Sequence, residues 1–311
     1  PPATGPAPVV RNRAPADNGR VSVIVPFFNP GVHFAEAIES VLTQSYDGWE
    51  LIVVDDGSTD GSTEIAHEYV SRYPERIRCV AHENRANRGI SATRNLGLAH
   101  ASGDFFCFLD ADDVWLPNKL ERQLAIMREV PRAAMLFGTP QYWYSWTGRI
   151  DDLMLDYVPD VLVPLDKLYE PPELMTLLYP LGVGNAPSMS DYIARTSMLE
   201  LTGGYEESFE GFYEDQAFLA KVYLRVPVYL ADECWSRYRI HEESCTAETR
   251  RTGGYAAARG KFLAWLDGHL ETSEFDHPII RRALELATPE KRRRGGDRIA
   301  RALEAVRRRA R

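Results

Sequence analysis

Three acidic residues with a single alanine among them follow a short apolar run. The run is residues 105–109, and the acids are Asp110, Asp112 and Asp113. A phenylalanine-rich run bounded by polar residues predicts a buried strand, which places the acids at the strand end where open α/β sheets bind ligands. Ionised carboxylates so close together repel each other, and a divalent cation such as Mg²⁺ or Mn²⁺ would join them together with substrate phosphates. The alternative is a solvated turn in which Asp113 caps a helix beginning near residue 117.

Two earlier strand ends also carry residues that could bind a nucleotide. Residues 21–25 form an apolar run that ends at Pro26 and Phe28, and residues 51–54 form another that ends at Asp55 and Asp56. Phe28 can stack on a base, and Asp56 can accept a hydrogen bond from the imide N–H of uracil or thymine. A core aromatic residue at position 28 and turn aspartates at positions 55 and 56 are the alternatives.

The elements that must position these residues alternate between strands and helices. After the first strand, Phe34, Ile38 and Val41 recur at helical spacing, and residues 65–73 and 90–99 continue the pattern after later strands. Such an alternation predicts right-handed βαβ units and therefore an α/β fold with a parallel sheet, whose strands end at a common edge. The chain has no G-x-G-x-x-G after its first strand and no G-x-x-x-x-G-K-[ST], which argues against a nicotinamide dehydrogenase and a P-loop ATPase.

Four further residues are candidates with simple structural alternatives. Arg94 lies near the predicted sheet edge, where a guanidinium can bind a base carbonyl or a phosphate, or it is a surface arginine. Glu214 and Asp215 open a predicted helix, and capping alone accounts for two acids in a first turn. His241 stands alone, and a lone histidine is more often a surface or core residue than a ligand.

Composition places the chain among ordinary globular proteins. Its 311 residues are 44% hydrophobic and 26% charged, which suits one large α/β domain with an appendage. The net charge of −9 argues against general nucleic-acid binding. Its four cysteines show no C-x-x-C spacing and indicate neither a disulfide framework nor a zinc site. No apolar stretch is long enough to span a bilayer and the N-terminus lacks a signal-peptide pattern, so we expect a soluble, cytoplasmic protein.

The chain divides into three parts by composition. Residues 1–20 are predicted to be a disordered leader, residues 21–245 the α/β domain, and residues 246–311 a helical extension with a basic tail. We expect the tail to be a solvated helix, with docking on an acidic partner or peripheral contact with anionic lipid as alternatives. The aromatic residues 142–146 could stack on a sugar, although packing as a strand is the commoner explanation.

Four of these segments in order resemble a known family. Residues 21–29, 53–60, 89–97 and 109–115 together are similar to the nucleotide-sugar half of the family 2 glycosyltransferases, which have the GT-A fold. The resemblance implies a Rossmann-like, mainly parallel mixed sheet flanked by helices. It also implies a donor site in which Pro26 and Phe28 line the base pocket and Asp56 and Arg94 contact uracil. In this site Asp110 and Ala111 contact the ribose and donor sugar, and Glu214 is a further residue that binds the nucleotide sugar. Asp112 binds a divalent cation (Mn²⁺ or Mg²⁺).

The same resemblance implies the chemistry. Asp215 becomes the base that takes the proton of an acceptor hydroxyl, in a direct displacement that inverts the anomer. His241 becomes a second ligand of the cation or a contact of the diphosphate, as in non-processive members. The chain lacks the Q-x-x-R-W segment of processive synthases, which favours transfer of a single sugar.

The partners expected from this resemblance are a nucleoside-diphosphate sugar, with UDP favoured, and a hydroxyl-bearing acceptor. That acceptor could be a saccharide, a lipid-linked glycan, a protein or a small molecule. Residues 151–187 are expected to shape this choice. Two other functions remain open: a non-catalytic nucleotide-sugar-binding or scaffold protein, and a sugar-phosphate nucleotidyltransferase. The latter needs a Gly- and Arg-rich triphosphate loop that residues 26–31 do not supply.

Overall fold

The computed structural model describes residues 19–288 except 210, 245, 246, 248–250, 252, 274 and 276. Its strands are β1 Val21–Phe27, β2 Trp49–Asp55, β3 Ile77–Ala81, β4 Phe105–Phe108, β5 Val114–Trp115, β6 Met135–Phe137, β7 Gln141–Trp143, β8 Lys167–Tyr169, β9 Tyr192–Arg195, β10 Val228–Leu230 and β11 Ser236–Arg239. Its α-helices are α1 Phe34–Leu42, α2 Ser62–Arg72, α3 Ile90–His100, α4 Lys119–Glu129, α5 Glu173–Leu177, α6 Leu199–Thr202, α7 Glu214–Arg225, α9 Tyr255–Thr272 and α10 Pro278–Ala287.

A large mixed sheet forms the centre of the fold. Within the described residues it has eight strands in the order β3-β2-β1-β4-β9-β6-β10-β8. Strands β3, β2, β1 and β4 run parallel, β9 runs antiparallel to both of its neighbours, and β8 runs antiparallel to β10. The predicted parallel βαβ succession is therefore confirmed for the first four strands, which share one edge for their C-terminal ends.

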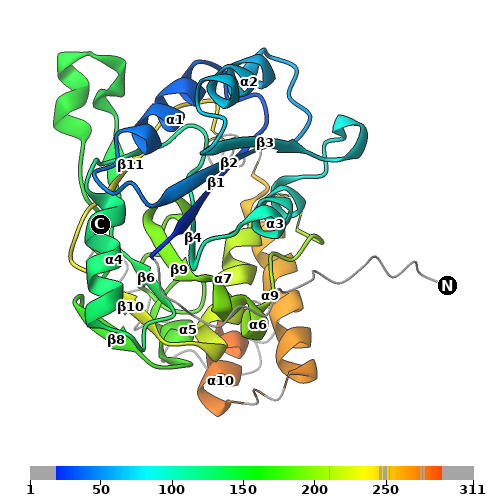
Figure 1. Cartoon of the computed structure of the whole chain (residues 1–311). Helices are drawn as coiled ribbons and strands as arrows, with labels where there is room; N and C mark the ends of the chain where they lie inside the picture. Colours follow the sequence, from blue (N-terminus) through cyan, green and yellow to red (C-terminus); the bar gives the residue numbers. More distant parts are fainter. Residues whose placement is uncertain are drawn as a thin grey trace.

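Helices cover both faces of this sheet, as Figure 1 shows. The residues Val21, Val23 and Val25 of β1 pack into one core with α1, α2 and α4. Ile24 of the same strand faces the other core, which contains residues of α7, α9 and α10. Side chains of successive strand residues point to opposite faces, so a strand buried on both sides needs an uninterrupted apolar run. The run at residues 21–25 meets this requirement at every position except Ser22.

Helix α3 lies very close to the sheet. A Cβ atom at Gly97 would come within 2.3 Å of Cγ2 of Ile24, so only glycine permits this approach of α3 to β1. The close packing fixes the helix, and with it Arg94 three residues earlier, near the C-terminal ends of the parallel strands.

A second sheet connects the acidic turn to the segment that carries His241. Its order is β5-β11-β7, with Ser236 opposite Trp115 and Tyr238 opposite Tyr142. β5 begins directly after Asp113, and β11 ends two residues before His241. The expectation that the aromatic stretch at residues 142–146 forms a strand is confirmed for residues 142 and 143, whereas residues 145 and 146 lie in a short 3₁₀ helix, Ser145–Thr147.

The C-terminal helices α9 and α10 are packed against α7 and α5 (Figure 1). Their buried residues join the core beneath the large sheet: Phe262, Leu263, Leu266, Leu270, Ile280 and Leu284. The predicted leader up to residue 18 and the basic tail from residue 289 lie outside the described residues. None of the helices in the described ranges combines the length and apolar character that crossing a membrane requires.

Candidate active site

One cavity of about 700 Å³ collects the predicted site residues. It lies at the C-terminal ends of the parallel strands and extends toward α7 and β11. The ten residues to which the family resemblance assigns a role all line it: Pro26, Phe28, Asp56, Arg94, Asp110, Ala111, Asp112, Glu214, Asp215 and His241. These residues come from segments up to about two hundred positions apart, and the sheet edge brings them together.

The three acids of the turn after β4 have three different partners. Asp110 accepts a hydrogen bond from Arg94 at 2.9 Å, and Asp112 lies 3.0 Å from His241. Asp113 is 1% exposed and accepts hydrogen bonds from the Ser190 hydroxyl at 2.6 Å and the Arg239 backbone N–H at 3.0 Å. Asp110 and Asp112 therefore line the cavity, and Asp113 does not. The capping alternative is wrong, because α4 begins after Asn118 rather than after Asp113.

Burial sets the protonation tendency of Asp113. Loss of water, and secondarily the charges of Asp112 and Asp110, raise the pKa of Asp113 well above its usual value, although the hydrogen bonds from Ser190 and Arg239 oppose this. Its partners come from the loop before β9 and from β11, so Asp113 connects the turn to both segments.

Asp112 and His241 form a pair of ligands that suits a divalent cation. The distance from Oδ2 of Asp112 to Nε2 of His241 is 3.0 Å, and Nδ1 of His241 is buried without a hydrogen-bond partner. Carboxylate oxygen and imidazole nitrogen are both common ligands of divalent metals. Among the described residues there is no cluster of three or more His, Cys, Asp or Glu side chains that could hold a metal ion. The pair therefore fits a cation that takes its remaining ligands from water and substrate phosphates.

Arg239 holds this pair in place, a role that was not expected from the sequence. Its guanidinium donates to the Asp112 backbone oxygen at 2.6 Å and to Glu36 at 2.6 Å. The same group lies over Trp143 at 4.5 Å and over Trp146 at 5.3 Å. Because Arg239 is only two residues before His241, these contacts fix the position of the histidine relative to Asp112.

His33 is a second neighbour that the sequence did not indicate. It belongs to the short helix η1 (Gly31–His33), lines the cavity, and its ring lies 5.2 Å from that of His241. Burial, followed by the charge of Arg239, lowers the pKa of His33. A neutral imidazole therefore faces this end of the cavity at neutral pH.

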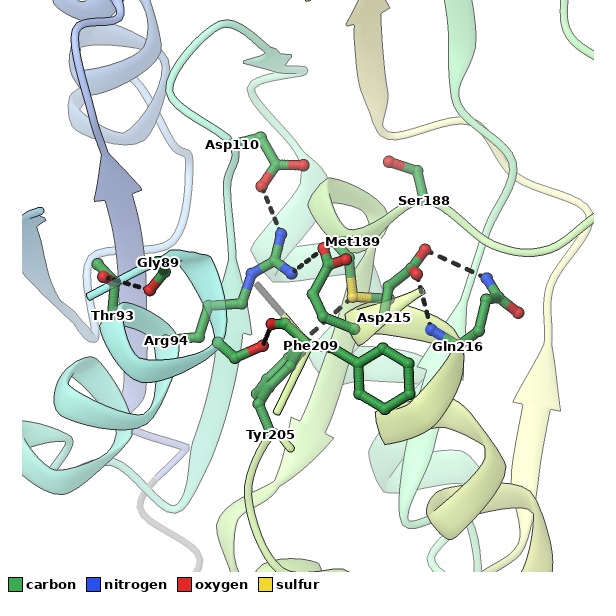
Figure 2. Close-up of polar contacts among 12 residues, drawn as sticks. Gly89, Thr93, Arg94, Asp110, Ser188, Met189, Tyr205, Phe209, Asp215 and Gln216 are labelled. Carbon is green, nitrogen blue, oxygen red and sulfur yellow. Dashed lines mark hydrogen bonds and ion pairs between the residues drawn. The ribbon is translucent and has the colours of Figure 1, made fainter. Parts of the chain in front are cut away.

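Arg94 is buried between two carboxylates, as Figure 2 shows for its bond to Asp110. Its side chain is 4% exposed, and its second terminal nitrogen donates to Glu214 at 3.0 Å. The alternative of a surface arginine is wrong. Burial and the charge of Asp215 raise the pKa of Glu214 to about 8, and Arg94 opposes this rise. Arg94 thus links the turn after β4 to the start of α7.

Asp215 stands at the start of α7, with its carboxylate beside Gln216 (Figure 2). It accepts hydrogen bonds from the backbone N–H of Gln216 at 2.7 Å and from the Gln216 side chain at 3.2 Å. Tyr213, which directly precedes Glu214 and Asp215, has φ +69°, a left-handed conformation that is strained for a bulky residue. This turn directs the first residues of α7 to the cavity, where Asp215 lies against the same space as Asp112.

Phe28 and Asp56 bring an aromatic ring and a hydrogen-bond-accepting carboxylate to the cavity lining. Phe28 is 52% exposed, so the alternative of a core aromatic is wrong. The two carboxylate oxygens of Asp56 accept hydrogen bonds from the backbone N–H groups of Arg88 at 2.7 Å and Gly89 at 3.0 Å. Each carboxylate oxygen has a second lone pair, so Asp56 can still accept from a ligand. Asp55 stabilises its own turn, as the structural alternative predicts, because it accepts hydrogen bonds from the backbone N–H groups of residues 57 and 58.

Comparison with known proteins agrees with this arrangement. Residues 22–157 match the family model described as Glycosyl transferase family 2. The match covers less than half of the chain, and over these residues the chain is similar to this family. The match spans β1 to the segment after β7 and contains the acidic turn, so the family expected from the four sequence segments is confirmed.

Curated relatives cover part of the chain. EpsE of Bacillus subtilis (strain 168) is 39% identical over 141 residues, which are 45% of this chain and 50% of EpsE. The UDP-Glc:alpha-D-GlcNAc-diphosphoundecaprenol beta-1,3-glucosyltransferase WfgD of Escherichia coli is 40% identical over 111 residues, which are 36% of this chain and 42% of WfgD. The chain thus spans about half the length of the curated relatives it matches.

Solved structures extend the likeness to most of the fold. S. aureus TarS 1-349 in complex with UDP-GlcNAc has a TM-score of 0.58 and 21% identity, and the match covers 88% of this chain and 82% of that chain. The mannosyltransferase PcManGT of Pyrobaculum calidifontis, in complex with GDP-Man and Mn²⁺, has a TM-score of 0.60 and 18% identity, and the match covers 92% of this chain and 79% of that chain. At these identities the likeness establishes the fold, and the predicted GT-A fold is confirmed.

Proposed function

We propose that this chain is a metal-dependent, inverting glycosyltransferase that moves a single sugar from a UDP-sugar to an acceptor hydroxyl. The observation that carries the proposal is the shared cavity. A half-exposed ring at Phe28, the Asp112–His241 pair and the Asp215 carboxylate all line it. These are the three groups that base binding, diphosphate binding and proton removal require.

At the donor end, Pro26 and Phe28 would enclose the base and Asp56 would accept from its imide N–H. Stacking of a base on an aromatic ring tolerates any base, so Asp56 carries the selection against adenine. WfgD, a relative by sequence, is named for UDP-Glc, and TarS was solved with UDP-GlcNAc. PcManGT was solved with GDP-Man, and the thermal-shift panel described below compares UDP-sugars with GDP-sugars.

At the diphosphate, Asp112 and His241 would hold the divalent cation. When bound there, a divalent cation supplies positive charge that stabilises the departing diphosphate. Arg94 was expected at uracil, but its terminal nitrogens are paired with Asp110 and Glu214. We therefore propose that Arg94 holds these two carboxylates in position. Asp110 and Ala111 would then contact the ribose and donor sugar.

At the acceptor end, Asp215 would take the proton of the attacking hydroxyl. A base on one side and a stabilised leaving group on the other suffice for one displacement at the anomeric carbon, which inverts its configuration. Glu214 is less suited to this role, because burial and the neighbouring Asp215 charge raise its pKa to about 8 and its carboxylate is paired with Arg94. We infer transfer of one sugar per encounter, since the chain lacks Q-x-x-R-W.

A thermal-shift panel of nucleoside-diphosphate sugars, with and without Mn²⁺, tests the donor assignment. A ligand that binds only the folded state raises the melting temperature, so a UDP-sugar should raise it and should do so more with Mn²⁺. The Asp112→Asn variant is the control and should lose the Mn²⁺-dependent part. Release of UDP in the presence of acceptors then separates an enzyme from a binding protein. Absence of any shift with all donors would contradict the proposal.

A further inference from the structure

The residue that precedes α7 has a backbone conformation that its own side chain does not favour. Tyr213 is the N-cap of this helix with φ +69° and ψ +8°, and its side chain makes no capping hydrogen bond. Glycine adopts this left-handed conformation at little cost, and Ser, Thr, Asp and Asn are the usual N-cap residues. A bulky aromatic residue has neither advantage, so contacts from elsewhere in the fold must hold the turn.

Three aromatic residues from distant segments hold the Tyr213 ring, which is 4% exposed. The ring stacks on that of Phe262, with 5.3 Å between the centroids, and lies 5.8 Å from the Tyr255 ring. The Tyr179 ring is 6.1 Å away, and its hydroxyl is hydrogen-bonded to the Tyr213 hydroxyl. Tyr255 and Phe262 belong to α9, whereas Tyr179 follows α5. We call Tyr179, Tyr255 and Phe262 the aromatic clamp.

The aromatic clamp acts on the part of the site that proton removal needs. Asp215 is the second residue of α7, and the Tyr213 carbonyl accepts a hydrogen bond from the Ala217 N–H at 2.9 Å. A change of φ at Tyr213 would therefore reorient the first turn of α7 and move the Asp215 carboxylate. Tyr213 is not itself a base, because burial, followed by its hydrogen bond with Tyr179, raises its pKa and keeps its hydroxyl protonated at neutral pH.

We propose that Tyr213 is a positioning residue for Asp215, and that α9 supports catalysis through the aromatic clamp. The clamp offsets the strain of the left-handed turn, and the turn directs the carboxylate to the attacking hydroxyl. Helix α9 lies well beyond the residues that match the family model, which end at residue 157. This inference rests on the proposed function, because Asp215 has to be the base for its position to matter.

Release of UDP from UDP-glucose and UDP-N-acetylglucosamine, with Mn²⁺ and with water as the only acceptor, tests the positioning. The water oxygen attacks the anomeric carbon, and Asp215 takes the water proton. The bond between the anomeric carbon and the diphosphate oxygen breaks, and its electron pair leaves with UDP. No sugar acceptor can contact Tyr213 in this assay, so a change in kcat reports on the position of Asp215.

Three substitutions of Tyr213 separate its ring from its backbone. Tyr213→Phe keeps the ring contacts and should release UDP like the wild type. Tyr213→Leu loses these contacts but still carries a side chain at φ +69°, so its kcat should fall about 10²-fold while the KM for the donor is unchanged. Tyr213→Gly loses the contacts but adopts this φ freely, so its kcat should be about tenfold higher than that of Tyr213→Leu. Packing alone predicts the reverse order, because glycine leaves the larger cavity.

Leu270→Ala is the matched control for loosening α9. Leu270 is 1% exposed near the C-terminal end of this helix and does not line the cavity. The variant should melt at a lower temperature but keep the wild-type kcat. Calorimetry with UDP and Mn²⁺ should give the same affinity for every variant, which also reports that each is folded. If Tyr213→Gly fails to fold, the contrast between Tyr213→Leu and Tyr213→Phe decides.

Three results would overturn the positioning role. They are a wild-type kcat in Tyr213→Leu, an equal loss of kcat in Leu270→Ala, and a folded Tyr213→Gly variant that is slower than Tyr213→Leu. Failure of the proposed function would appear separately, as a lack of UDP-sugar binding and UDP release in the wild type.

Discussion

Arg94 is the residue whose removal should harm the fold of the site most. Its side chain is 4% exposed and its terminal nitrogens lie 2.9 Å from Asp110 and 3.0 Å from Glu214. Arg94→Met keeps most of the volume but leaves two partly buried carboxylates without a counter-charge. Breaking a buried pair in this way costs about 3–5 kcal/mol. Because the Asp110 side chain is 29% exposed and can be hydrated, we expect a loss of unfolding free energy at the lower end, about 3 kcal/mol.

The pH dependence of this loss identifies its cause. Burial already raises the pKa values of Asp110 and Glu214, and removal of Arg94 raises them further above their unfolded values. A carboxyl group with a raised folded pKa destabilises the fold as pH rises through that range. Urea unfolding followed by tryptophan fluorescence should therefore show a larger deficit at about pH 8 than at about pH 5.

The control is Arg132→Met, which breaks a pair with Glu170 whose side chains are 70% and 43% exposed. Surface pairs contribute about 0–1 kcal/mol, so this variant should be close to the wild type at both pH values. Equal losses for the two variants, or an Arg94→Met deficit that does not change with pH, would refute the assignment of Arg94 as a buried bridge.

Three further predictions concern single side chains. Burial favours the neutral form of Glu50, but hydrogen bonds from Ser22 and Ser102 outweigh it and lower the pKa of Glu50. The stability that its charge contributes is therefore present above about pH 4.5 and is lost as the pH falls through the folded pKa. The melting temperature should fall more steeply with decreasing pH for the wild type than for Glu50→Gln, and parallel curves of melting temperature against pH would contradict this. Gly97→Ala should destabilise the fold by about 1–3 kcal/mol, because the new Cβ would lie 2.3 Å from Cγ2 of Ile24. Its control, Gly260→Ala in α9, meets no atom within 4 Å and should stabilise in chemical denaturation, so the opposite order would refute the close packing of α3. Phe28→Ala should weaken UDP binding by about 1–3 kcal/mol in calorimetry without lowering the melting temperature, because the ring is 52% exposed, and unchanged affinity would remove Phe28 from the base pocket.

Local patterns in the sequence were sufficient to predict that several candidate residues meet at one edge of the sheet. Apolar runs that end in Phe28, Asp56 and Asp110 indicated strands that end together, since parallel strands connected by helices share an edge. The structure then places all three residues on one cavity. This inference needed only the period of the apolar residues and the handedness of βαβ units.

The partners of these residues could not be predicted in the same way. Arg94 and Glu214 are 120 positions apart, and Arg239 reaches Glu36 across 203 positions. No local period relates such residues, because their contact depends on how α7 and β11 cross the strand ends. For the same reason the spacing of the three acids did not show that Asp113 would be buried against Ser190 while Asp110 and Asp112 line the cavity.

The central claim is that Asp112 and Asp215 serve different steps within one cavity, and paired measurements on Asp112→Asn and Asp215→Asn test it most directly. Donor binding with Mn²⁺ is measured by calorimetry, and sugar transfer by UDP release with an acceptor. We expect Asp215→Asn to bind the UDP-sugar like the wild type but to transfer it about 10²–10⁴-fold more slowly, as loss of a general base requires. Asp112→Asn should lose the Mn²⁺-dependent part of binding itself. Near-wild-type transfer by Asp215→Asn with unchanged donor affinity would contradict the account.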